Sequence, residues 1–172
     1  MATTIQQTQL SVSLSENITI NGVLYGNTIN TSFQGNGKVD QRVLAINSST
    51  LTDIWNYKEL PPDGAGYGVK DEFTYFRITN TDDALSITLQ LYVSSSKSGF
   101  FNIPPRCSFM LMANDMDFLC EGESYSVADL ASVKVQTIAP KDAKAVSSSY
   151  VEYIAVFKGG TDINASRESE EG

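Results

Sequence analysis

The fold is decided by the stretch Phe73–Leu111, which reads FTYFRITNTDDALSITLQLYVSSSKSGFFNIPPRCSFML. In its middle, from Leu85 to Val93, apolar residues alternate strictly with polar ones. A period of two is typical of a strand with one buried face and one wet face. Turn residues, among them Asn80-Thr81-Asp82-Asp83, separate four such candidates and predict one antiparallel unit, with strands at residues 76–78, 85–93, 101–103 and 107–111.

The rest of the chain repeats this pattern. Leu10, Val12 and Leu14 alternate with serines, and Asn21-Gly22 between two apolar runs is the strongest short-range hairpin signal. Further strands are predicted where apolar residues recur, at Val43-Leu44 with Ile46, at residues 133–137 and at residues 151–157. Gly35-Asn36-Gly37 predicts another turn. Many short strands between turns favour an all-β fold, an antiparallel sandwich or jelly roll with little or no helix.

The length of 172 residues suggests one domain with a full core. Residues 1–8 are small and polar and are expected to form a loosely held N-terminal arm. Residues 9–158 carry the strand pattern and form the predicted β-sandwich domain. Residues 159–172 end in RESEEG, which predicts a disordered acidic tail.

Charge and composition exclude several functions. The net charge of -8 argues against duplex nucleic acid as a partner, because that binding needs clustered Lys and Arg. The absence of histidine removes the commonest general base and zinc ligand. No apolar run reaches the ~20 residues of a membrane helix, so we expect no membrane partner. The first residues lack the regions of a secretion signal, so we expect synthesis in a host cytosol and two reduced, buried or half-buried thiols at Cys107 and Cys120.

No pattern of catalytic or metal-binding residues stands out. Oxygen ligands gather in two predicted turns, at Asn80, Asp82 and Asp83 and at Asn114, Asp115 and Asp117. Neither turn supplies the glycine and distal glutamate of a calcium loop, and Asn and Asp favour turns for their backbone hydrogen bonds. There is also no phosphate loop, no GxSxG elbow and no nucleophile–base pair around either cysteine. We expect no enzyme, no metal and no cofactor.

Two kinds of contact site are open. Residues 58–71 carry two prolines and three glycines, so they are either an exposed connection or a contact loop. Our candidate interface residues are Pro61, Pro62 and Tyr67 of this loop, with Trp55 and Ile5. The second possibility is a carbohydrate-binding module, because aromatic rings can stack on sugars. Aromatic residues on a sheet more often form cross-strand pairs. The candidate stacking residues are Trp55, Tyr57, Tyr67, Tyr75 and Tyr92.

The order of these features resembles a family of virion structural proteins of tailed bacteriophages, found in marine and environmental phages. The resemblance covers about residues 10 to 157. It rests on five blocks: a "TLNG"-like hairpin at residues 15–22, a strand ending in small polar residues at 42–50, a "YxRITNTDxxxxVTLQL" block at 75–91, an "fxIPPGxSFxL" block at 101–111 and a last strand at 153–157. Arg106-Cys107 stands where many members carry a glycine turn.

The resemblance implies a structural role and brings no catalytic residues. We expect a non-covalent decoration protein of the capsid shell, forming a homo-oligomer, with a trimer favoured, and binding the major capsid protein in the virion. A head–tail connector or tail protein, bound to portal or tail proteins, is the alternative within the same particle. A receptor-binding carbohydrate module is the alternative of another class.

Overall fold

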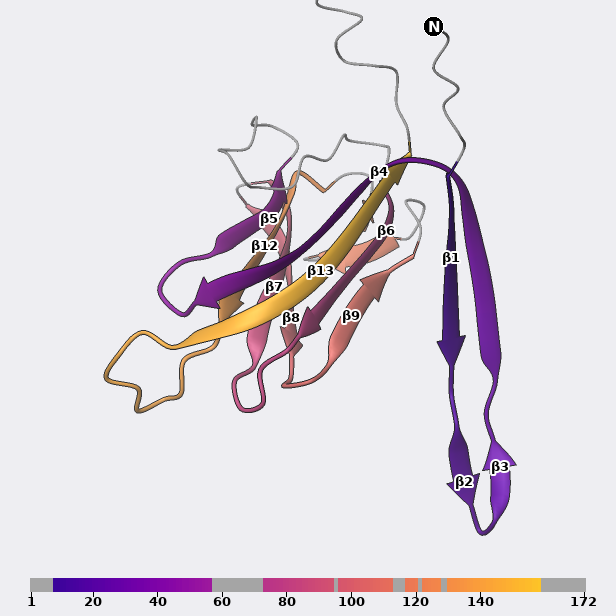
Figure 1. Cartoon of the computed structure of the whole chain (residues 1–172). Coiled ribbons are helices and arrows are strands. Elements are labelled where there is room, and N and C mark those ends of the chain that lie inside the picture. Colours follow the sequence, from indigo (N-terminus) through magenta and orange to yellow (C-terminus); the bar gives the residue numbers. More distant parts are fainter. Residues whose placement is uncertain are drawn as a thin grey trace, which may run out of the picture.

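The computed structural model describes residues 8–56, 73–94, 96–112, 117–120, 122–127 and 130–158. It confirms the predicted all-β antiparallel sandwich (Figure 1). In chain order the strands are β1 (Thr8–Ser15), β2 (Ile18–Ile20), β3 (Val23–Tyr25), β4 (Thr28–Asn47), β5 (Thr52–Asn56), β6 (Phe73–Asn80), β7 (Ile87–Ser94), β8 (Lys97–Ile103), β9 (Ser108–Leu111), β10 (Asp117–Cys120), β11 (Glu123–Ser126), β12 (Ser132–Thr137) and β13 (Ser148–Lys158).

Eight of these strands make two packed sheets with jelly-roll topology. One sheet has the order β4-β13-β6-β9, and the other has the order β5-β12-β7-β8. Four antiparallel pairs run through both sheets: β4 with β13, β5 with β12, β6 with β9, and β7 with β8. The chain is therefore one long hairpin rolled up on itself, in which every connection except β7–β8 passes between the sheets. We call these eight strands the roll.

The core lies between the two sheets and is built by the predicted alternation. Its fully buried members come from the inner faces of both sheets: Ile46, Phe76, Ile78, Val151, Tyr153 and Phe157 from one, and Ile54, Ile87, Leu89, Leu91, Val133 and Val135 from the other. Burying one such side chain contributes about 1.5–3 kcal/mol. The 73–111 stretch does not form the single predicted antiparallel unit: it supplies the pair β6–β9 to one sheet and the pair β7–β8 to the other, because the chain crosses between the sheets after β6 and after β8.

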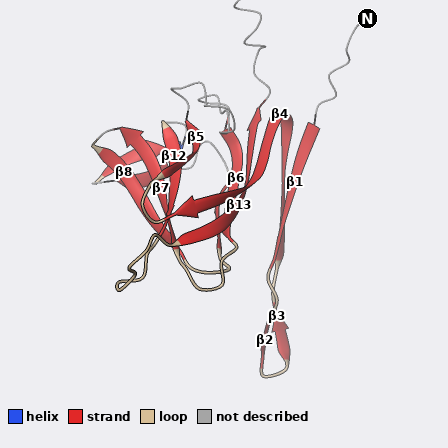
Figure 2. Ribbon diagram, turned by 60° about the vertical axis from the view of Figure 1, so that its left-hand side comes forward, coloured by secondary structure: helices blue, strands red, loops and turns tan. Residues whose placement is uncertain are grey.

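Residues 8–33 stand outside the roll. They pair β1 with the first half of β4 and end in the small β2–β3 pair. Figures 1 and 2 show this long two-stranded unit leaving the end of the roll and running beside it, beyond its lower edge. We call residues 8–33 the projecting hairpin and residues 18–25 its tip.

The structure corrects two details around β4. Gly35-Asn36-Gly37 does not end a strand: β4 continues through it, and Asn36 pairs with Thr8 of β1 on one side and Lys158 of β13 on the other. The chain bends there from the projecting hairpin into the roll (Figure 1). Val43 is not a core residue, because neighbours on a strand face opposite sides; Ile46 is buried and Val43 is exposed.

The prediction for the two cysteines is confirmed only in part. Both are free thiols, and Cys120 is buried with its Sγ donating to the carbonyl of Ser98 at 3.3 Å. Cys107 is exposed, contrary to the expectation of a buried or half-buried thiol. It follows Arg106, whose positive φ of 61° turns the chain outward between β8 and β9.

Candidate interaction surface

The projecting hairpin is shaped by local sequence alone. Asn21 and Gly22 have φ values of 52° and 80°, so the predicted Asn-Gly turn closes β2 and β3. Gly26 is needed where the two strands come closest, because a Cβ there would lie 2.0 Å from the carbonyl oxygen of Glu16. The ladder resumes at once with a hydrogen bond from the Glu16 amide to the Asn27 carbonyl at 2.9 Å.

Most apolar side chains of the projecting hairpin lie on one face, where Thr31 opposite Val12 is a polar exception. The cross-strand pairs Leu10–Phe33 and Leu14–Ile29 lie on this face of the β1–β4 ladder. The pairs Ile18–Tyr25 and Ile20–Val23 follow at the same alternation in the tip. All four tip residues are more than half exposed. A two-stranded hairpin is at best marginally stable in water. In this one Leu10, Val12 and Phe33 are half-buried, while the apolar side chains of the tip are open.

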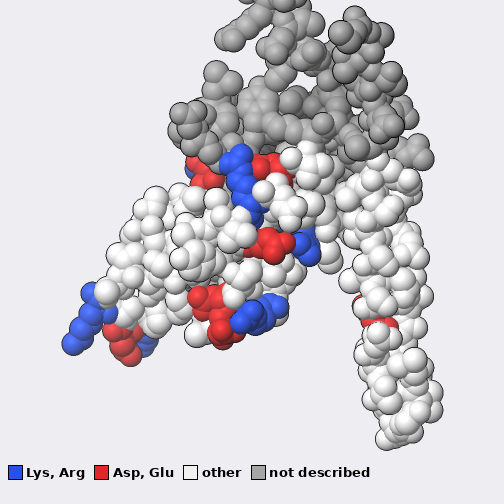
Figure 3. All heavy atoms as spheres, in the orientation of Figure 1, with Lys and Arg blue, Asp and Glu red and all other residues white. Residues whose placement is uncertain are grey.

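Charge is nearly absent from the same surface. Charged residues make up 19% of the chain, yet Glu16 is the only one between Thr8 and Phe33. Figure 3 shows the projecting hairpin almost entirely white beside a roll that carries both charge signs. Proteins usually guard free strand edges with charged side chains, and the cores of protein interfaces are depleted of them. The hairpin has the composition of an interface.

A groove of about 530 Å³ lies between the projecting hairpin and the outer face of the β4-β13-β6-β9 sheet. One wall is β1 from Leu10 to Leu14. The other wall is formed by residues of the roll: Tyr75, Arg77, Ser108, Met110, Met112 and Ile154. The walls are mixed: Leu10, Val12, Leu14, Met110, Met112 and Ile154 are apolar, while Ser11, Ser13, Arg77 and Ser108 are polar. The Nε atom of Arg77 is buried and has no hydrogen-bond partner among the described residues, although its other end pairs with Glu152 at 2.9 Å.

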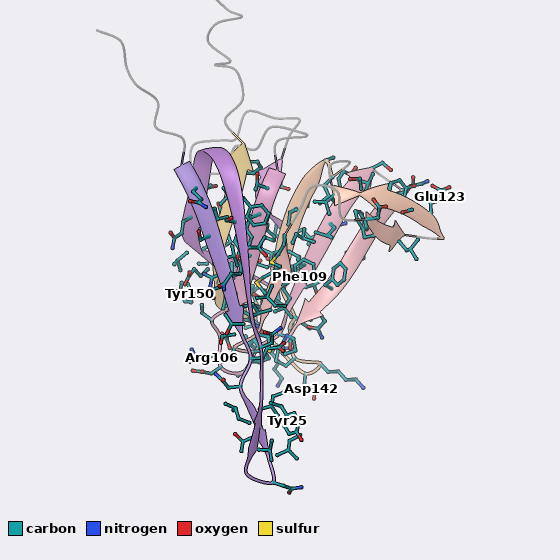
Figure 4. The ribbon with its side chains drawn as sticks, turned by 90° about the vertical axis from the view of Figure 1, so that its right-hand side faces the viewer. Tyr25, Arg106, Phe109, Glu123, Asp142 and Tyr150 are labelled. Carbon is teal, nitrogen blue, oxygen red and sulfur yellow. The ribbon has the colours of Figure 1, made fainter. Side chains whose placement is uncertain are left out.

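The outer face of the sheet continues beyond the groove. Val39, Val43 and Tyr150 lie there and are each more than half exposed. Figure 4 shows Tyr150 on this outer side and Phe109 between the two sheets, with Tyr25 far away near the end of the projecting hairpin. The face is thus partly apolar and open, next to the groove.

The RITNTD and IPP blocks have a structural role around Asn80. Asn80 is fully buried at the end of β6, and its Nδ2 donates to the carbonyls of Leu85, Ile103 and Pro104 at 2.8–3.2 Å. Its Oδ1 accepts from the amide of Asp82 at 3.1 Å. One side chain therefore ties the β6–β7 turn to the end of β8.

Asp82 and Arg106 complete the two turns. The amides of Leu85 and Ala84 both donate to Asp82 Oδ1 at 2.8 Å, and these bonds hold the pKa of the Asp82 carboxyl below its ordinary value. The Cys107 amide donates to the Pro104 carbonyl at 3.2 Å and closes a tight turn around Arg106. Arg106 has a positive φ, a conformation that glycine adopts readily. This agrees with the glycine turn that many of the phage proteins resembled by this sequence carry at the same place. The Arg106 guanidinium pairs with Asp83 and links the turns.

The remaining ionisable groups pair with one another rather than converge on a cavity. At the β10–β11 hairpin, the half-buried Lys97 bonds Glu123 and Tyr125; its bond to Glu123 raises the pKa of Lys97 and lowers that of Glu123. In the roll, Tyr153 donates to Asp40 Oδ2 at 2.8 Å, and burial, reinforced by this bond, raises the pKa of Tyr153. Within the described ranges, no three His, Cys, Asp or Glu side chains group as metal ligands.

Most of the predicted contact residues lie outside the part of the chain that the structure describes. Ile5, Pro61, Pro62, Tyr67 and Tyr57 lie outside the described residues. The backbone of Trp55 lies in β5 opposite Val133, while its side chain is not described.

The two other aromatic candidates are engaged by this chain. Tyr75 is buried, which corrects its proposed role as an open sugar-stacking ring. Tyr92 is half-buried, with Lys134 Nζ 5.5 Å from the centre of its ring. Neither ring is free to stack on a ligand as it stands.

The sequence patterns did not predict an interaction site at the projecting hairpin. Its alternation shows one apolar face but not what that face covers. The available signal was the near-absence of charge from Thr8 to Phe33 in a chain rich in acidic residues.

Comparison with known proteins gives no matching family model, no matching curated protein and no matching solved structure. The resemblance to phage structural proteins therefore stays a prediction from sequence blocks. In the part of the chain that the structure describes, no helix has the length and apolar character needed to cross a bilayer.

Proposed function

We propose that this chain is a structural component of a tailed-phage particle, docked non-covalently on the capsid shell as a decoration protein. The observation that carries the proposal is the projecting hairpin: an apolar, nearly uncharged β-unit that reaches beyond the roll and lacks a cover of its own. A part of this kind suits a protein that is completed by assembly with others.

Two further features support the same role. The jelly roll is a fold used by viral capsid proteins as well as by lectins and cupins, although a fold alone does not decide function. The blocks shared with phage structural proteins also turn out to hold turns together, as Asn80 does, rather than to carry chemistry.

Quantitative mass spectrometry of purified particles tests the proposal. A copy number comparable with that of the major capsid protein is expected for shell decoration. A far lower number, fixed by the single portal vertex, would replace shell decoration by the head–tail connector or tail role. Absence of the chain from washed particles would overturn the proposal altogether.

Glycan binding is less well supported than it was from sequence. Of its candidate rings, Tyr75 is buried and Tyr92 contacts Lys134. A glycan array probed with the full chain is expected to show no saturable binding. Saturable binding that Trp55→Ala abolishes would restore the receptor-binding alternative.

A further inference from the structure

The tip and the groove are two surfaces that do not contact each other within one chain. The tip presents Ile18, Ile20, Val23 and Tyr25 on one face, all exposed. The groove presents walls of mixed apolar and polar residues around about 530 Å³ of space. The tip lies beyond the lower edge of the roll (Figure 1) and away from the groove of its own chain.

We propose that the tip of one copy docks in the groove of a second copy, head to tail, so that copies close into a ring. Because donor and acceptor are different surfaces, every copy offers both, and repetition gives either a closed ring or an open filament. This inference does not depend on the particle role, since self-association can be measured on the purified chain.

Charge selects a second copy as the occupant. Each copy carries a net charge of -8 and therefore repels another copy wherever acidic groups meet. The hairpin has a single carboxylate, at Glu16, and so can approach an identical chain without that penalty. A basic partner would be matched by acidic residues, and the tip has none. Interfaces between identical chains are also more apolar than transient ones.

The groove itself lacks one polar partner. The buried Nε of Arg77 finds no acceptor among the described residues, and an unpaired buried donor destabilises a protein. The incoming tip brings backbone carbonyls at its free strand edges, which are suitable acceptors. Docking would cover the apolar tip, and an opening of the groove to admit the tip would let one of these carbonyls reach the buried Nε.

The test uses two complementary variants of the full chain. Ile20→Asp places a charge on the docking face of the tip, and Ser108→Arg blocks the exposed lip of the groove. Both positions lie outside the core, so circular dichroism should match the wild type. Leu119→Asp is the matched control, because Leu119 is also a large exposed apolar residue, 77% exposed, but lies on β10.

Light scattering after size-exclusion chromatography should show an oligomer for the wild type and for Leu119→Asp. Each of the two site variants alone should weaken self-association by roughly 10- to 100-fold and elute as a monomer. Mixed together, they should form a one-to-one dimer, since the intact tip of one still meets the intact groove of the other.

Several results would overturn the proposal. They are a monomeric wild type, an oligomer that survives Ile20→Asp, an equal loss with Leu119→Asp, or a mixture that forms no dimer. The same holds if a monomeric wild type co-sediments with phosphatidylcholine vesicles and Ile20→Asp abolishes this, because the tip would then be a membrane-binding element.

Discussion

At the scale of single residues, the described loops are held by short polar side chains that bond to the backbone. Asn80 is the most demanding of these, because it is fully buried and serves carbonyls from two separate segments. A buried carbonyl that loses its donor cannot turn to water instead. This one amide joins the end of β6 to the turn before β7 and to the end of β8.

Asn80→Ala should therefore lower the free energy of unfolding by roughly 2–4 kcal/mol, because three carbonyls lose their donor and a cavity opens. Urea denaturation followed by circular dichroism measures it. Asn102→Ala is the control, since Asn102 is exposed on β8 and its loss should change stability by no more than about 0.5 kcal/mol. Equal effects at both positions would show that Asn80 does not join the turns.

Acid should weaken the β6–β7 turn through Asp82. Amide donors lower the pKa of its carboxyl in the folded chain below the ordinary 3.8. The stabilising contribution is therefore complete above 3.8 and is lost as the pH falls through the lower, folded-state pKa.

Asp82→Asn cannot titrate, so its unfolding free energy should fall less steeply than that of the wild type as the pH drops from about 5 to about 2. Urea titrations at several pH values would show it. Asn102→Ala, an exposed substitution that removes no titratable group, is the control and should run parallel to the wild type. If Asp82→Asn is also parallel, the carboxylate does not hold the turn.

At the scale of elements, the roll and the projecting hairpin have different sources of stability. The strands of the roll bury their inner faces against one another. The tip strands β2 and β3 bury nothing, as every residue in them is exposed. Elements with so little burial open at low free energy, so the tip is expected to open more easily than the roll.

Shortening the hairpin tests whether the stability of the roll is independent of the projecting hairpin. Ser15 pairs directly with Thr28, so replacing residues 16–27 by Asn-Gly should close β1 and β4 with a two-residue turn. The unfolding free energy of the roll should change by less than about 1 kcal/mol, since no tip residue belongs to the core. Self-association should be lost.

Denaturant melts and light scattering give the two readouts of this change. Replacing the exposed loop at residues 141–145 by a glycine–serine linker is the control, and it should leave the oligomer intact. A shortened hairpin that unfolds the roll would show that the tip stabilises its own chain.

At the scale of the whole molecule, charge is divided between the parts. The roll carries the ion pairs of the described chain, such as Arg77–Glu152 and Lys134–Asp53, while the hairpin carries only Glu16. Assembly through the hairpin brings net acidic bodies together by way of an apolar contact. Salt should therefore assist it.

Raising NaCl from about 0.1 M to about 1 M shortens the Debye length from about 10 Å to about 3 Å. Repulsion between copies is screened while the apolar contact is kept, so the dissociation constant of the oligomer should fall. Sedimentation velocity at both salt concentrations measures it. A weaker oligomer at high salt would indicate that ion pairs hold the copies together, contrary to the proposed contact.

Much of the fold could be read from local pattern. The alternation at Leu85–Val93, the Asn21-Gly22 turn and the last strand all predict what is found, because strand period and turn geometry depend on neighbouring residues. The prediction of Val43 in a core strand and that of a turn at Gly35–Gly37 were wrong. The first needed the register with β13, and the second needed the change of strand partner along β4.

The sequence by itself determined that this is an antiparallel β protein with an acidic surface, since side-chain period, turn residues and net charge are properties of the chain. Only the tertiary structure decided where each apolar face is directed. The alternation of β7 and that of the projecting hairpin are equivalent in sequence, but one face is sealed in the core and the other is open. Burial depends on which strands meet across space, and that follows from the rolled topology rather than from any local run of residues.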